Sequence, residues 1–443
     1  MSFFKSYISI SLKSQCRSIS TNKSSVPFSI YLHWPYCESK CTYCNFNKYI
    51  QPPQVPEDRL KKAMAKEIQY YVNQYQLKHR PLHSIYFGGG TPSLAKPSTL
   101  SYLLDTLDHT CYLPTNIEIT MEANPTSMEL EKLEAFRKIG INRLSLGIQS
   151  FDDVALQRMG RDHSGTESIR AIGMAKRSFD NMTFDLIFAR PGQTLHDWKK
   201  ELMLGLDLAS NHLSLYQLSL ERGTPIYKAV MKGELPPIPN QDEAADMYEM
   251  TVELARDHGF HHYEVSNYSR YPHTISRHNF SYWQGMDYLG IGPGAHGRLT
   301  DPTTLQRVRT FAEFHPDKYM DLCESSGEGL RSITPISDEQ TKEELVVFGL
   351  RTKMGIPYRR FESITHGSHL DDMINQEALK LCMDAGFLIQ ERSQEGTKET
   401  KDDLIQPYIP YENRSEWNLG GIRPTEKGLA RMDTILPMLL NHS

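Results

Sequence analysis

The chain has 443 residues and a formal net charge of −5, with 39% hydrophobic and 23% charged residues. This composition is typical of a globular protein long enough for one large domain and a smaller one. No apolar run reaches the about 18 residues that a membrane-spanning helix needs, and without a basic excess nothing in the composition predicts nucleic-acid binding.

The first 26 residues have the composition of a mitochondrial presequence. They contain Lys5, Lys13, Arg17 and Lys23 together with many serines, and no acidic residue precedes Glu38. Basic, serine-rich and acid-poor segments are typical of transit peptides. The sequence therefore predicts a mitochondrial location, with a merely disordered tail as the alternative.

Three cysteines lie close together in the stretch Tyr31–Tyr49, which reads YLHWPYCESKCTYCNFNKY. Cys37, Cys41 and Cys44 have the spacing C-x3-C-x2-C, and thiolates of this kind select zinc or an iron–sulfur cluster. A zinc site usually has four ligands, so three cysteines suit a 4Fe-4S cluster with one iron left open. Structural or zinc-binding cysteines remain the alternative.

The other four cysteines, Cys16, Cys111, Cys323 and Cys382, are scattered. An odd total with three cysteines in one short segment does not indicate a disulfide framework, and a reducing compartment fits better.

The cysteine spacing, with aromatic Tyr43 before the last cysteine, resembles the fingerprint of the radical S-adenosylmethionine superfamily. The resemblance implies that the open iron binds the amino and carboxylate groups of S-adenosylmethionine. It also implies that an electron passed to the sulfonium yields a 5′-deoxyadenosyl radical.

Short β-rich segments then alternate with amphipathic helices. A helix is predicted at residues 57–76, and six strands are predicted at 29–32, 84–87, 117–121, 143–148, 183–188 and 212–220, with helices such as 127–139 and 166–179 between them. Alternating units of this kind predict parallel strands. Six of them match the superfamily's partial, open (β/α)6 barrel, so we expect an α/β core domain over residues 27–300 with its chemistry at the carboxyl ends of the strands.

Polar and glycine-rich segments follow these strands. Gly88, Gly89 and Gly90 with Thr91 would let backbone groups approach a ligand, and Glu122 offers an acceptor. Later strand ends carry Gln149, Arg161 and Asp185, and an arginine can clamp a carboxylate. Taken singly, each polar residue could equally satisfy a loop backbone.

Taken together, the segments are very similar to the family that contains oxygen-independent coproporphyrinogen III oxidase and the HemW haem chaperone. The resemblance implies two S-adenosylmethionine sites, the first formed by Tyr31, Tyr43, Gly89 and Glu122, and the second by Gly90, Thr91, Gln149, Arg161 and Asp185. One departure is Ala189 with Arg190, where the family has glycine and leucine.

Two features favour the chaperone branch over the oxidases. Phe46 stands where the oxidases carry a fourth cysteine, and residues 278–283, HNFSYW, reproduce the chaperone motif H-N-x-x-Y-W. A neutral imidazole is a good axial ligand for haem iron, so the resemblance implies haem ligation by His278. The alternative is that His278 forms hydrogen bonds within a loop.

Residues 301–335 are predicted to be a linker with irregular structure, and residues 336–443 a second domain. Helices at 339–350 and 373–385, a strand at 386–390, a polar loop through Asp403 and a last helix after Gly428 suggest a winged-helix-like α+β module. Its acidic residues outnumber its basic ones, which opposes binding to phosphates. Packing or partner docking is the better interpretation.

The sequence thus predicts a haem chaperone with a 4Fe-4S cluster and S-adenosylmethionine, which binds haem and passes it to acceptor proteins such as respiratory cytochromes. The alternative functions are oxidative decarboxylation of coproporphyrinogen III and radical chemistry on an unrelated substrate. Whether a radical is formed, and whether the chain is a homodimer, stays open.

Overall fold

The computed structural model describes residues 26–126, 132–392 and 411–440. Its centre is a curved sheet in which six parallel strands follow one another in chain order. These are β1 (Phe28–Trp34), β4 (Leu82–Gly89), β5 (Glu118–Ala123), β6 (Arg143–Gln149), β7 (Asn181–Phe188) and β8 (His212–Gln217). The predicted partial (β/α)6 barrel is therefore confirmed.

Further strands extend both edges of this sheet and leave it open. Beyond β1 lie β11 (Asp287–Ile291), which is parallel to it, and then the antiparallel strands β12 (His296–Thr300), β13 (Arg307–Ala312) and β14 (Leu330–Pro335). Beyond β8 lies β10 (Asn267–Ser269), which is antiparallel to β8, and then β9 (His261–Glu264), which is antiparallel to β10. The described residues therefore form one mixed, twelve-stranded sheet.

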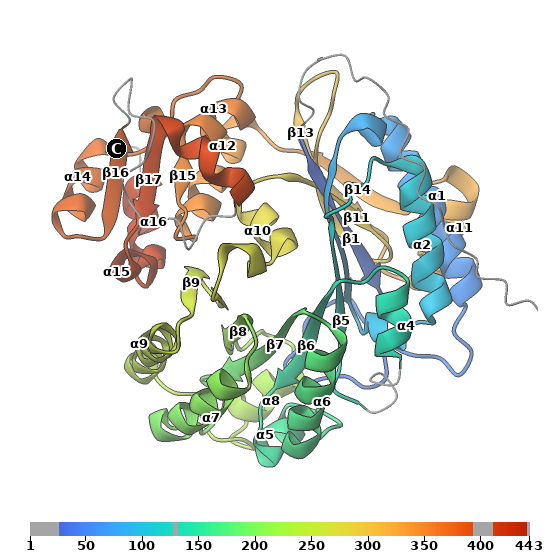
Figure 1. The fold of residues 1–443 in the computed structure, drawn as a ribbon, viewed down its shortest axis with the longest axis horizontal. Coiled ribbons are helices and arrows are strands. Elements are labelled where there is room, and N and C mark those ends of the chain that lie inside the picture. Colours follow the sequence, from blue (N-terminus) through green and yellow to red (C-terminus); the bar gives the residue numbers. More distant parts are fainter. Residues whose placement is uncertain (1–25, 127–131, 393–410, 441–443) are drawn as a thin grey trace, which may run out of the picture.

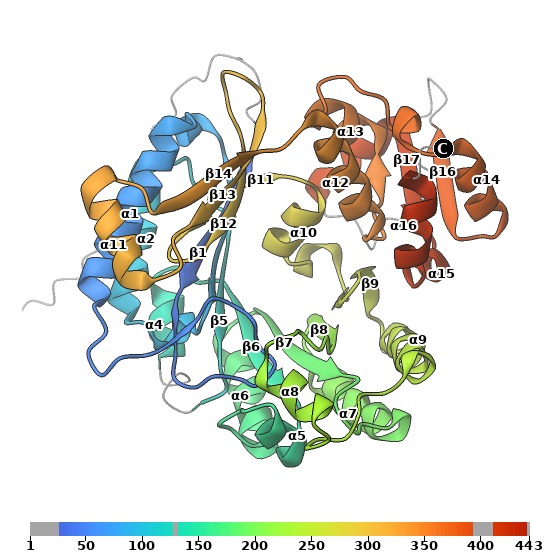
Figure 2. The same cartoon turned by 180° about the vertical axis from the view of Figure 1, so that it is seen from behind.

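Helices cover the outer side of the curved sheet, whereas α10 lies on its inner side (Figures 1 and 2). Outside are α1 (Glu57–Gln74), α2 (Pro97–Thr110), α4 (Leu133–Lys138), α5 (Asp153–Arg158), α6 (Gly165–Ser178) and α7 (Leu195–Leu208). Later in the chain come α8 (Pro225–Met231), α9 (Gln241–Asp257) and the inner helix α10 (Arg277–Trp283). Residues 127–131 of the predicted helix 127–139 lie outside the described residues. No helix of the described chain is long and apolar enough to cross a bilayer.

The segment 301–335, expected to be a linker, instead contains β13, β14 and the helix α11 (Pro316–Ser326) between them. Val308, Thr310 and Ala312 of β13 point into the protein. The intervening Arg309 is exposed, and Arg307 is buried because its guanidinium donates to the carbonyl of Gly285 over 2.6 Å. Polar Thr310 on this buried face and apolar Phe311 on the opposite face weaken the apolar alternation that identifies strands in a sequence.

A buried carboxylate fastens this added segment to α1. Glu67 accepts hydrogen bonds from the hydroxyl of Tyr319 (2.5 Å) and from the amides of Gly292 (2.9 Å) and Gly329 (3.2 Å). Burial raises the pKa of Glu67 to about 7, against the opposing effect of these donors. One side chain therefore joins α1, α11 and two loops that are distant in the sequence.

The second domain has its own apolar core, which runs from Leu345 to Leu439. Helices α12 (Asp338–Leu350), α13 (Tyr358–Ile364), α14 (Gln376–Asp384), α15 (Glu426–Leu429) and α16 (Met432–Leu440) surround the strands β15 (Ile356–Pro357), β17 (Gly420–Pro424) and β16 (Leu388–Arg392). β16 and β17 are antiparallel, as a hairpin-like wing requires. The predicted polar loop lies mostly outside the described residues.

The helix α10 packs against the second domain. Arg360 of α13 donates to the carbonyl of Gln284, just after α10, over 3.0 Å. The ring of Trp283 packs edge-on against Phe348 of α12, with 6.2 Å between centroids. The residues that carry the H-N-x-x-Y-W motif therefore lie between the barrel and the second domain.

Replacing Glu67 tests the joint between α1 and the added segment. Glu67→Ala leaves three buried donors without an acceptor, and each such loss costs about 1–3 kcal/mol, so we expect the free energy of unfolding to fall by about 3 kcal/mol or more. Glu67→Gln keeps one acceptor oxygen and should lose less. Urea unfolding followed by circular dichroism measures both, and an alanine variant as stable as the wild type would contradict the assignment.

Candidate functional site

A cavity of about 470 Å³ lies at the carboxyl ends of the parallel strands. Residues from the cysteine loop and from the ends of β4, β5, β6 and β7 line it. Among them are eleven of the residues that the sequence analysis singled out, namely Cys37, Cys41, Tyr43, Cys44, Gly89, Gly90, Thr91, Glu122, Gln149, Arg161 and Asp185. The structure thus brings together segments that are spread over about 150 residues of the sequence.

The cysteine loop is fixed to the glycine run by main-chain hydrogen bonds. The amide of Gly90 donates to the carbonyl of Trp34 over 2.6 Å, and the amide of Thr91 donates to that of Tyr36 over 2.9 Å. A Cβ atom at Gly90 would lie 2.5 Å from the oxygen of Tyr36. Glycine is therefore required at this position so that the two backbones can approach each other.

The loop itself closes on a short two-stranded sheet. β2 (Tyr36–Cys37) pairs in parallel with β3 (Tyr49–Ile50), so the ends of the segment that carries the cysteines are held side by side. His33 supports the same loop because its Nε2 atom is 2.8 Å from the carbonyl oxygen of Asn47. The three thiols consequently project from one anchored loop.

The thiols suit a multinuclear cluster better than a single ion. All three line the one cavity and none forms a disulfide. A structural zinc ion usually takes four ligands, whereas each cysteine of an iron–sulfur cubane binds a different iron. The donor set therefore fits a cluster.

Two carboxyl groups on neighbouring parts of the barrel line the cavity. Glu122 accepts a hydrogen bond from the hydroxyl of Tyr86 over 2.7 Å. Removal from bulk water raises the pKa of Glu122 to about 7 and that of Asp185 to about 6. Near neutral pH both groups can therefore gain or lose a proton, or ionise when a cationic ligand binds.

Arg161 lies directly beside the cysteine loop. Its Nη1 atom donates to the sulfur of Cys41 over 3.2 Å, and its Nη2 atom donates to the side-chain oxygen of Asn124 and to the carbonyl of Gly147, both over 2.7 Å. The guanidinium therefore joins the cysteine loop to the ends of β5 and β6.

Tyr31 and His278 lie outside this set of cavity-lining residues. Tyr31 packs behind the glycine run, where its hydroxyl is 3.2 Å from Nδ1 of His33 and its ring stacks on Tyr86 with 6.0 Å between centroids. Tyr31 therefore packs against Gly88 of the glycine run without lining the cavity itself.

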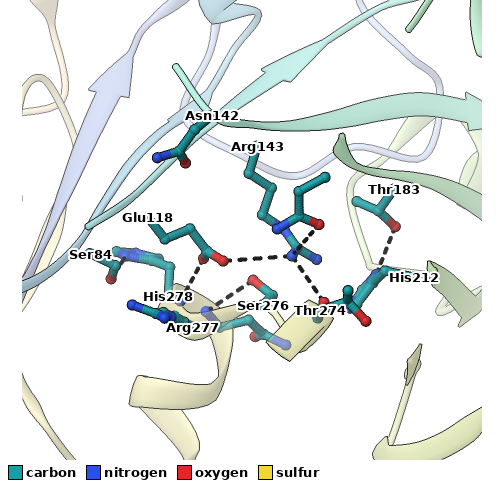
Figure 3. A network of polar contacts seen from close by, with 12 residues as sticks. Ser84, Glu118, Asn142, Arg143, Thr183, His212, Thr274, Ser276, Arg277 and His278 are labelled. Atoms are coloured by element: carbon teal, nitrogen blue, oxygen red, sulfur yellow. Dashed lines mark hydrogen bonds and ion pairs between the residues drawn. The ribbon is translucent and has the colours of Figure 1, made fainter. Parts of the chain in front are cut away.

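His278 is buried on the inner side of the barrel near the amino-terminal ends of β4 and β5, where Figure 3 shows it beside Ser84 and Glu118. Its Nδ1 atom is 2.9 Å from the hydroxyl of Ser84, and its Nε2 atom is 2.7 Å from that of Tyr282. Burial lowers the pKa of His278 to about 3, so the ring is neutral. Both ring nitrogens are thus engaged within the protein.

An ion pair supports the start of α10. The amide of His278 donates to Glu118 over 3.3 Å, and Glu118 lies 3.6 Å from the guanidinium of Arg143. Arg143 also donates to the carbonyl of Thr274 over 3.0 Å, just before the helix (Figure 3). Polar side chains inside the barrel therefore hold the H-N-x-x-Y-W segment in place.

Comparison with known proteins agrees with this arrangement. The Radical SAM superfamily matches residues 31–204. The chain is 37% identical over 419 residues to the mitochondrial radical S-adenosyl methionine domain-containing protein 1 of Bos taurus, covering 93% of this chain and 87% of the relative. It is 33% identical over 417 residues to the heme chaperone HemW of Haemophilus influenzae, covering 94% and 98%. The chain belongs to the radical SAM superfamily, in the family of these proteins.

A solved structure shares the whole architecture. The coproporphyrinogen III oxidase HemN from Escherichia coli, a radical SAM enzyme, superposes with a TM-score of 0.70 at 21% identity, and the match covers 94% of this chain and 90% of that one. At this identity the likeness shows the fold alone.

Several cavity residues of this radical SAM protein were not selected from the sequence. Asn124, Ser145, Gly147 and Tyr216 also line the cavity. Ser145 and Gly147 alternate with Gln149 along β6, and alternate residues of a strand share one face. This period of two was the signal that could have identified them.

The departure at Ala189 has a visible consequence. Ala189 has a φ of +56°, a left-handed conformation that favours glycine, which explains why the family uses glycine there. Arg190 is buried and forms an ion pair with Glu201 of α7, and it does not line the cavity. Its charge is therefore neutralised away from the candidate site.

Titration of Glu122 gives a prediction that needs no cofactor. Because its pKa in the folded protein, about 7, exceeds the ordinary 4.5, the folded chain holds this proton more tightly than the unfolded chain. The resulting stability is present below about pH 4.5 and is lost as the pH rises through about 7.

Glu122→Gln keeps an acceptor for Tyr86 but cannot titrate. We expect the wild type to lose up to about 3 kcal/mol relative to this variant across that pH range. Urea unfolding at several pH values measures the difference. Parallel stability curves would refute the raised pKa.

Proposed function

We propose that the chain is a mitochondrial haem chaperone, which binds haem and passes it to acceptor proteins. The observation that carries the proposal is the 33% identity to the heme chaperone HemW of Haemophilus influenzae over nearly the whole of both chains. The mitochondrial location is supported by the names of the animal relatives and by the basic, acid-free first 26 residues. Residues 1–25 lie outside the described part of the chain.

Cys37, Cys41 and Cys44 would hold a 4Fe-4S cluster. The residues at the strand ends, with Tyr43 and the glycine run, would hold S-adenosylmethionine in the same cavity. When bound, such a cluster would supply one electron to the sulfonium. The chain's own contribution is to place the backbone of Gly89 and Gly90 and the carboxyl groups of Glu122 and Asp185 around that cavity.

Phe46 separates this proposal from the oxidase alternative. In the oxidases a fourth cysteine occupies this position, whereas here the phenylalanine lines the cavity and is 67% exposed. An exposed aromatic ring beside the cavity offers an apolar surface and cannot replace a thiolate ligand. The fold shared with HemN carries no argument for oxidase activity.

Haem ligation by His278 would require a rearrangement. Its Nε2 atom is engaged by Tyr282, while Nδ1 is engaged by Ser84. Release of the Tyr282 bond would leave Nε2 for iron, and the bond to Ser84 would still orient the ring, as partners of a metal-bound imidazole commonly do. Movement of α10 away from the barrel would then expose the ring, which is now buried.

Variants of the motif test this assignment. In a haem titration of the full-length protein we expect His278→Gln to weaken haem binding at least tenfold, because it removes the axial ligand. Tyr282→Phe should tighten binding, because it removes the hydroxyl that competes for Nε2.

Anaerobic activity assays with coproporphyrinogen III as substrate distinguish the haem chaperone from the oxidase alternative. The reconstituted wild type should not decarboxylate this substrate. Turnover of coproporphyrinogen, or haem binding unchanged in His278→Gln, would overturn the proposal for the function or for the ligand, respectively.

A further inference from the structure

We propose that Arg161 is a positioning residue that raises the reduction potential of the cluster through an N–H···S hydrogen bond to Cys41. The inference rests on the cluster of the proposed function and goes beyond the ligand-contact role that the family resemblance implies for Arg161.

The contact with sulfur is part of a fixed arrangement. One end of the guanidinium, Nη1, donates to Cys41, and the other end, Nη2, is shared between Asn124 and the carbonyl of Gly147. The two ends therefore have different partners on different elements. Rotation of the guanidinium away from Cys41 would break both short bonds at Nη2.

The chain also docks the segment that carries Arg161 onto the cysteine loop. Thr42, between two of the cysteines, donates its amide to the carbonyl of Met159 over 2.9 Å and its hydroxyl to that of Arg158 over 2.8 Å. Gly160 has a φ of +70°, and a Cβ atom there would lie 3.2 Å from the amide of Thr42. The end of α5 is thus held tightly against the loop, so the reach from Arg161 to Cys41 is set by the fold.

Arg161 is the cation placed to act on the sulfur. The basic residues that line the cavity in the described chain are Lys48 and Arg161, against several acids. Of these two cations, Arg161 donates a hydrogen bond to the sulfur of Cys41. Reduction adds one electron to the cluster and changes no bond or proton. A cation and an N–H donor at a ligand sulfur stabilise that added charge and raise the potential.

Donor capacity is left for a ligand. The Nε atom of Arg161 is buried and has no hydrogen-bond partner among the described residues. Because an arginine has five donors, a carboxylate in the cavity could engage the same side chain while Nη1 stays on Cys41. The two roles of Arg161 are therefore compatible.

The test compares three variants of the full-length protein after anaerobic cluster reconstitution. Arg161→Gln removes the charge and the original donor, Arg161→Lys keeps the charge, and Arg158→Gln removes an equal charge from an exposed side chain nearby. Dithionite titration followed by electron paramagnetic resonance gives the midpoint potential, and iron and sulfide analysis gives the cluster content.

We expect the potential to become more negative in Arg161→Gln, to lie in between in Arg161→Lys, and to stay near the wild type in Arg158→Gln. If the midpoint potential of Arg161→Gln equals that of Arg158→Gln, the inference is overturned. A loss of cluster content without a change in potential would show that Arg161 has a merely structural role.

If Arg161→Gln fails to assemble its cluster, a further variant, Asn124→Ala, tests the same hydrogen bond. Asn124→Ala removes one of the two partners that hold Nη2 and should shift the potential in the same direction by a smaller amount. An unchanged potential there would overturn the inference. Absence of any cluster from the wild type would instead defeat the proposed function, and the inference with it.

Discussion

The position of the three cysteines at the cavity depends on the main-chain pairing between the cysteine loop and the glycine run. β1 and β4 are parallel neighbours, so their following loops leave the sheet at the same edge. Hydrogen bonds from the amides of Gly90 and Thr91 to the carbonyls of Trp34 and Tyr36 continue that pairing beyond the strands. The loop that carries the thiols is thereby placed beside the carboxyl ends of the other strands.

The cavity and the H-N-x-x-Y-W segment both contact Tyr86 of β4. The hydroxyl of Tyr86 donates to Glu122, which lines the cavity, and the ring of Tyr86 stacks on His278 with 4.9 Å between centroids. The cavity at the carboxyl edge and the helix α10 inside the barrel are therefore both contacted by the half-buried Tyr86. The proposed cofactor site and the proposed haem ligand belong to one packed unit.

Much of this organisation could be predicted from the sequence, because the signals were local. Alternating strands and helices predicted the parallel order from β1 to β8, and the polar residues after those strands lie around one cavity. The strand β13, which lies between β12 and β14, was missed because polar Thr310 is on its buried face and apolar Phe311 is on the other, which weakens the alternation. The environment of His278 could not be predicted, because the partners of its ring nitrogens include Ser84, which is distant in the sequence and is brought near only by the fold.

The family resemblance and the physical interpretation of the site meet at the three cysteines. The structure presents all three from one anchored loop that lines the cavity, and three thiolates suit a cluster with one open iron. Metal and sulfide analysis of protein purified without oxygen tests this most directly. The account predicts about four iron and four sulfide per chain, lost when Cys41 is replaced by serine, whereas zinc in their place, or a cluster that survives the replacement, would contradict it.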